Sequence, residues 1–157
     1  MTFIQLVETT TTRSGEMDAP AEEQAMSRKV QQFAVAGSFL ECLAAQDFAR
    51  IGNALTADGR LRALLPGGLR ERTGAETIAS AFATWFGDTE DFELLGATVG
   101  EVGGRLHVHW RLRLQAERLG AGWFVVEQQA YADAAADGRI GRLDLLCTGY
   151  RPENSNG

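Results

Sequence analysis

The spacing of apolar residues changes once along this chain, from helical periodicity to strict alternation. Between residues 21 and 46 apolar side chains recur every three or four positions, which predicts a long helix. Asp47 can cap a second, shorter helix, and Gly74 opens a third. Between these helices, Asp58-Gly59 indicates a turn and Leu61–Leu65 predicts a short strand.

After Gly87 the pattern is that of β-strands. Leu106–Gln115 alternates without exception, placing leucine, valine and tryptophan on one face and histidine, arginine and glutamine on the other. Three further strands are expected, at Phe92–Val102, Trp123–Asp133 and Ile140–Tyr150. Helices followed by a run of strands predict an α+β domain. The tail from Arg151 is expected to be frayed.

The first residues differ from the rest. Thr2–Glu8 has the apolar content of a short strand, but Thr9–Pro20 is polar and contains a threonine run, a glycine and a proline. We expect residues 1–21 to form a flexible arm, and a docked edge strand is the alternative. The folded domain is expected at 22–152, followed by a disordered tail at 153–157.

Four segments resemble the nuclear transport factor 2-like superfamily in its SnoaL-like form: Phe39–Ile51, Gly74–Phe82, Asp137–Ile140 and Leu143–Pro152. The resemblance implies a cone-shaped α+β fold, with three N-terminal helices packed on a curved, mixed but mostly antiparallel sheet around an apolar pocket. The last segment is similar to the final strand of SnoaL-like proteins from actinobacteria. The superfamily includes ketosteroid isomerases, polyketide cyclases and non-catalytic domains, so the fold alone does not select an activity.

The acid and phenol groups of the isomerases are missing from the matching positions. The resemblance places those positions at Phe39, Ala63, Phe82 and Gln128. Phenylalanine and alanine cannot exchange a proton, so ketosteroid isomerase chemistry is not expected. We find no pair of inward acids of the kind that the epoxide hydrolases use. The catalytic residues, if the protein is an enzyme, stay unknown.

With Gln128 directed inward, as the resemblance implies, strand parity and helix periodicity direct a set of mostly aromatic side chains inward. These residues either fill a solid core or line a ligand pocket. The ligand-pocket candidates are Phe39, Phe82, Trp85, Trp110, Gln128 and Cys147. Gln128 must bond a neighbouring group or a ligand carbonyl, because a buried amide without a partner costs about 1–3 kcal/mol. Cys147 is either an inert thiol or a nucleophile, and no histidine is expected beside it.

The opposite face of the sheet is expected to be an outer surface. His107 and His109 point the same way, but they lack a third ligand and share their face with arginines, so no metal is expected. No glycine-rich phosphate-binding loop follows a strand, so no organic cofactor is expected either. The resemblance implies a homodimer built on this face, through His109, Arg111, Glu127, Gln129 and Tyr131. Four arginines are expected around the open end of the cone: Arg60, Arg62, Arg70 and Arg72. They form either a solvated rim or a binding site for an anionic or carbonyl-bearing ligand.

Composition limits the classes of partner and the cellular compartment that are expected for this chain. The chain has 157 residues, 45% of them hydrophobic, and a formal net charge of -6, which argues against nucleic acid or a membrane as a partner. Two isolated cysteines and the lack of a leader or a long apolar run favour the cytoplasm. Two functions stay open. One is a domain that binds a small apolar ring-containing metabolite, with or without transforming it; the other is a non-catalytic dimeric accessory protein with a filled cone.

Overall fold

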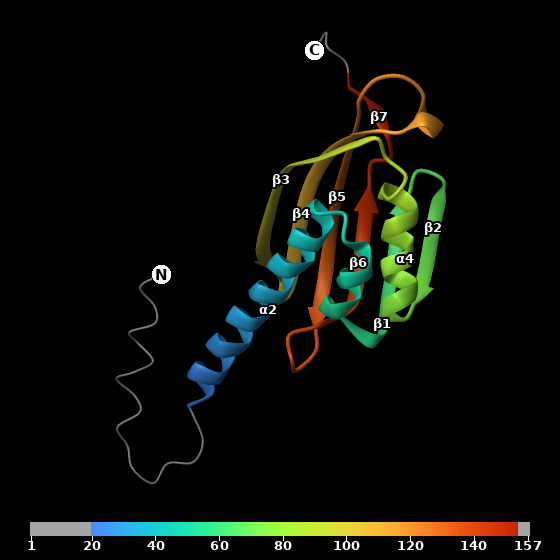
Figure 1. Ribbon diagram of the computed structural model, residues 1–157. Helices are drawn as coiled ribbons and strands as arrows, with labels where there is room; N and C mark the ends of the chain where they lie inside the picture. Colours follow the sequence, from blue (N-terminus) through green and yellow to red (C-terminus); the bar gives the residue numbers. More distant parts are fainter. Residues whose placement is uncertain (1–19, 154–157) are drawn as a thin grey trace.

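A computed structural model describes residues 20–153 of the chain (Figure 1). Helices come first and strands dominate the second half. The elements are α2 (Ala21–Ala44), α3 (Phe48–Ile51), η1 (Gly52–Ala54), β1 (Leu55–Leu65), β2 (Gly68–Thr73), α4 (Ala75–Phe86), β3 (Asp91–Val102), β4 (Arg105–Gln115), η2 (Glu117–Leu119), β5 (Phe124–Ala134), β6 (Ile140–Cys147) and β7 (Arg151–Pro152). The residues expected to form the flexible arm lie outside the described part, except Pro20 and Ala21, and so do 154–157.

The strands form one seven-stranded sheet in the order β2-β1-β6-β5-β4-β3, with β7 paired to the start of β5. Only β1 and β6 run parallel, and every other pairing is antiparallel. Figure 1 shows α2 and α4 lying across the same side of the curved sheet. Three helices on a curved, mixed sheet confirm the expected α+β cone fold.

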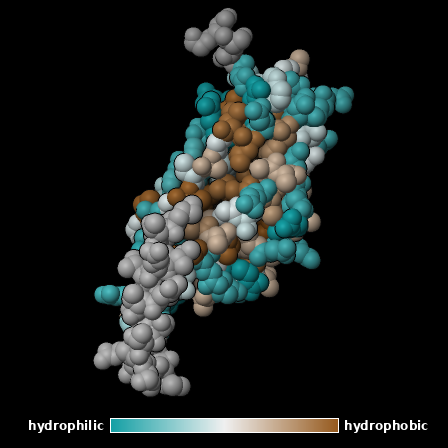
Figure 2. All heavy atoms as spheres, turned by 60° about the vertical axis from the view of Figure 1, so that its left-hand side comes forward, coloured by the Kyte–Doolittle hydropathy of each residue, from teal (hydrophilic) through white to brown (hydrophobic). Residues whose placement is uncertain are grey.

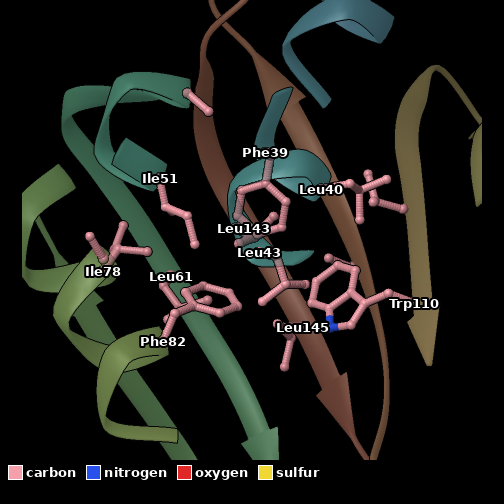
Figure 3. Close-up of a cluster of buried hydrophobic side chains, with 14 of the residues drawn as sticks. Phe39, Leu40, Leu43, Ile51, Leu61, Ile78, Phe82, Trp110, Leu143 and Leu145 are labelled. Atoms are coloured by element: carbon pink, nitrogen blue, oxygen red, sulfur yellow. The ribbon is translucent and has the colours of Figure 1, made fainter. Parts of the chain in front are cut away.

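Alternation along the strands decides which face the helices cover. In β4, Leu106, Val108, Trp110, Leu112 and Leu114 are buried, whereas the residues between them are partly or fully exposed. A strand points successive side chains to opposite faces, so its apolar half enters the core. Figure 3 shows Trp110 of this face meeting Phe39 of α2 and Phe82 of α4. The other four side chains belong to the same buried cluster.

Two local expectations are wrong. Asp58-Gly59 is not a turn before a strand but part of β1, where the pairing with β6 shifts register between Leu55 and Arg60. The Gly59 carbonyl accepts a hydrogen bond from Gly74 N at 2.7 Å, which holds this stretch extended. The tail is also ordered further than expected, because Arg151–Pro152 pair with β5 as β7.

Helix α2 is buried over its second half only. Ala36, Phe39, Leu40 and Leu43 enter the core, while the first half carries exposed apolar side chains such as Val30. Figure 2, seen from the side of α2 and β3, shows hydrophobic residues gathered in the middle of that face. No helix within residues 20–153 is long and apolar enough to cross a membrane.

Candidate functional site

A cavity of about 440 Å³ opens at one end of the cone. Its walls come from the end of α4, the end of β1 and its following turn, the first half of β5, and the chain that leaves β6. The lining residues are Leu65, Pro66, Trp85, Phe86, Val126, Gln128, Cys147, Thr148, Gly149 and Tyr150. Most of these side chains are apolar or aromatic, so the cavity suits a hydrophobic molecule with few polar groups.

The six sequence-predicted pocket residues divide into two groups. Phe39, Phe82 and Trp110 lie in the core and are at most 2% exposed. Their rings pack against one another, with centroids 5.4 Å apart for Phe39–Phe82 and 5.5 Å for Phe39–Trp110. Trp85, Gln128 and Cys147 line the cavity. The first three therefore support the cavity from behind, while the other three can touch a molecule inside it.

Gln128 is the buried polar residue of the core, at 1% exposure. Trp110 Nε1 donates a hydrogen bond to Gln128 Oε1 at 2.8 Å, across the β4–β5 pair. An indole N–H can only donate, so it determines which end of the amide is the oxygen. The amide nitrogen Nε2 has no hydrogen-bond partner within residues 20–153, and its residue lines the cavity. Two N–H donors are thus left for a bound molecule.

Tyr150 closes the cavity on the side of α4. Its hydroxyl donates to the Trp85 carbonyl at 2.5 Å, and Arg118 Nη2 donates to the same carbonyl at 2.8 Å. The Arg118 guanidinium also lies 4.9 Å from the centre of the Tyr150 ring. This contact ties the end of α4 to the chain after β6. Trp85, whose carbonyl accepts both bonds, also lines the cavity.

Strand parity predicts Tyr150 on the outer face, and that prediction is wrong. Strand β6 ends at Cys147, and Gly149 adopts a φ of +79°, which turns the chain back toward the cavity. A Cβ on Gly149 would come within 2.6 Å of Pro66 Cγ, so the turn needs glycine at this point. Gly149 is therefore the sequence signal that the alternation of inward and outward side chains ends before Tyr150.

Cys147 has no base beside it. Its Sγ accepts a hydrogen bond from Gly149 N at 3.3 Å. Both histidines occupy the outer face, where His107 Nε2 donates to Gln129 Oε1 at 2.9 Å and His109 Nε2 donates to Glu127 Oε1 at 2.7 Å. Among residues 20–153, no aspartate, glutamate, histidine or lysine lines the cavity. Within the described part of the chain, no three potential ligands gather into a metal-binding group.

The outer face carries a cluster of ion pairs around Asp144. This carboxylate accepts hydrogen bonds from Arg62 at 3.0 Å and Arg105 at 2.9 Å, and Arg142 Nε lies 3.3 Å away. Burial by itself raises the pKa of Asp144, but the arginine hydrogen bonds and charges outweigh it and hold that pKa below its usual value. Arg62 is therefore a partner of Asp144 and not part of the rim of the cavity.

Comparisons with known proteins agree on the fold. The chain matches no family model and no curated protein. Among solved structures it is similar to a phenazine biosynthesis-related protein from Pseudomonas aeruginosa, at 15% identity over 82% of this chain and 86% of that one, with a TM-score of 0.60.

Two others have the same architecture. A candidate SnoaL-like polyketide cyclase from Shewanella putrefaciens is 11% identical over 74% of this chain and 89% of its own, with a TM-score of 0.59. A steroid delta-isomerase from Pseudomonas aeruginosa is 17% identical over 74% and 79%, with a TM-score of 0.54. The chain therefore has the nuclear transport factor 2-like fold.

Proposed function

We propose that the protein binds a small, apolar, ring-containing metabolite in the cavity between α4 and the ends of β1, β5 and β6. The volume of about 440 Å³ supports this, because small-molecule pockets usually measure roughly 300–1,000 Å³. Trp85 and Phe86 offer aromatic surface to a ring system. The similar architecture of a candidate polyketide cyclase and a steroid delta-isomerase supports a ligand-binding use of the cone.

The amide of Gln128 is the observation that carries the proposal. Its oxygen is occupied by Trp110, and its nitrogen offers donors to the cavity. The ligand should therefore present a hydrogen-bond acceptor, such as a ring carbonyl, to Gln128. A ligand that offers only donors leaves the amide nitrogen unpaired and gains nothing from it.

Fluorenone and fluorene form a matched pair for the test, since they share a ring system and differ by one carbonyl. Titration of tryptophan fluorescence gives their dissociation constants for the wild type and for Gln128→Leu. We expect fluorenone to bind the variant about fivefold more weakly, which corresponds to about 1 kcal/mol, and fluorene to be unaffected. Gln129→Leu makes the same change on the outer face and should alter neither ligand.

Two precautions keep the test decisive. If Gln128→Leu unfolds, the double variant Trp110→Phe with Gln128→Leu removes the unpaired indole donor as well and provides a second background. An equal loss for both ligands assigns Gln128 to structure alone. If neither ligand binds below the millimolar range, the cavity is not a ligand site.

A different function, that of a non-catalytic dimeric accessory protein, is favoured by two other observations. Phe39, Phe82 and Trp110 fill the middle of the cone with packed rings. On the outer face, Leu64 and Leu146 are neighbours across the β1–β6 pair, and each exposes more than two-fifths of its surface. An exposed apolar pair beside the polar residues predicted for the interface supports a homodimer.

A further inference from the structure

A second cavity of about 300 Å³ lies between β2 and α4. Its polar lining comes from Arg70 and Arg72 on β2 and from Thr77, Ser80 and Thr84 on α4. It shares Leu65 and Trp85 with the first cavity, so the two hollows adjoin at these side chains. An apolar cavity and a cationic, hydroxyl-lined groove thus stand next to each other.

The pairing of β2 with β1 explains why both arginines reach this groove. Arg70 lies opposite Ala63 and Arg72 opposite Leu61, and both β1 partners are buried in the core face. Arg70 and Arg72 are therefore on the side of the sheet that α4 covers. Glu71, between them, falls on the other face, opposite Arg62. Alternation separates the two positive charges from the nearest carboxylate in the sequence.

The two guanidinium groups are not neutralised by acids. Arg70 Nη1 donates to the Leu69 carbonyl at 3.1 Å, and Arg72 Nη1 donates to the Glu71 carbonyl at 2.8 Å. Neither forms an ion pair with any carboxylate in residues 20–153, and no acidic residue lines the groove. Arg62 on the neighbouring strand, by contrast, is paired with Asp144.

We propose that this groove holds the anionic group of a ligand whose rings occupy the adjacent cavity. The two guanidinium groups and the hydroxyls of Thr77 and Ser80 can donate hydrogen bonds to a carboxylate, sulfonate or phosphate, whereas the Thr84 hydroxyl already donates to the Ser80 carbonyl at 3.0 Å. The two positive charges favour an anion between them. This inference rests on the proposed function and narrows it: the ligand is an amphipathic acid with an apolar ring system and a hydrogen-bond acceptor.

Two fluorescent dyes with the same rings test it. Anilinonaphthalenesulfonate carries one negative charge, and phenylnaphthylamine is its uncharged counterpart. We expect wild-type protein to bind the anionic dye about tenfold more tightly than the neutral one, with a preference that shrinks as salt is added. In the double variant Arg70→Gln with Arg72→Gln, the anionic dye should lose about tenfold in affinity and the neutral dye should be unchanged.

A charge-matched control separates the groove from general electrostatics. Arg28→Gln with Arg60→Gln also removes two positive charges, from α2 and from the outer face of β1, and should change neither dissociation constant. If both double variants weaken the anionic dye equally, the groove is not an anion site, and neutral-dye binding leaves the proposed function intact. If neither dye binds wild-type protein, the proposed function fails and this inference fails with it.

Discussion

Trp110 and Gln128 face each other across β4 and β5, and the indole Nε1 donates to the amide Oε1 at 2.8 Å inside an otherwise apolar core. The bond satisfies a donor that would otherwise be buried without a partner. It also orients the amide so that its N–H groups are available to the cavity. A single pair of side chains therefore serves both the stability of the core and the chemistry of the site.

The first prediction concerns the stability of this pair. Gln128→Leu leaves the indole N–H without a partner and should lower the free energy of unfolding by about 1–3 kcal/mol. Trp110→Phe leaves the amide oxygen unpaired and also removes packing. The double variant should be more stable than the sum of the two losses predicts, by about 1 kcal/mol. Urea unfolding monitored by circular dichroism measures all four proteins, and strictly additive losses would contradict the coupling.

The second prediction is that the turn at Gly149, beside the cavity, requires glycine for the stability of the fold. Gly149→Ala adds a Cβ that meets Pro66 Cγ at 2.6 Å, in a residue with a φ of +79°. The expected loss of unfolding free energy is about 1–3 kcal/mol. Gly96→Ala is the matched control, because its Cβ has no neighbour within 4 Å and its φ is not positive. The prediction fails if chemical denaturation gives both variants the same stability.

The dimer prediction can be tested at one residue. Leu146 is 43% exposed on the outer face of β6. Light scattering of the wild type at micromolar concentration should give twice the chain mass of 17.0 kDa. Leu146→Asp should return the mass to that of one chain, because a carboxylate in an apolar contact loses its water without gaining a partner. Val30→Asp, on an exposed part of α2, should stay dimeric. A monomeric wild type rules the interface out.

The Asp144 cluster predicts how stability depends on pH. The folded-state pKa of Asp144 lies below its usual value, so the unfolded chain binds its proton first as the pH falls. The contribution of this residue is present above about pH 4 and is lost at lower pH. Asp144→Asn should lower the melting temperature at pH 7 and flatten its decline below about pH 4. Asp58→Asn removes a carboxylate that has no ion pair within the described residues and should preserve the wild-type profile.

The local pattern predicted the elements and their buried faces well. Alternation in Leu106–Gln115 placed Trp110 inward, and the resemblance placed Gln128 inward; the structure puts the two opposite each other on β4 and β5. The rule failed where a glycine interrupted it, at Gly149 and in the bulged start of β1. Periodicity could not tell which of the six pocket candidates line the cavity and which lie in the packed core. The sequence pattern of a buried aromatic ring is the same whether the ring faces a cavity or another ring.

The sequence by itself determined the helical and strand periods and the inward direction of Trp110. These follow from the chemical identity of each residue and its immediate neighbours. Only the tertiary structure decided that β6 lies parallel to β1, that Tyr150 reaches the Trp85 carbonyl, and that Arg70 and Arg72 stand against the hydroxyls of α4. Those contacts join segments far apart in the chain, and their geometry depends on how the sheet curves and where α4 lies across it, which no local period encodes.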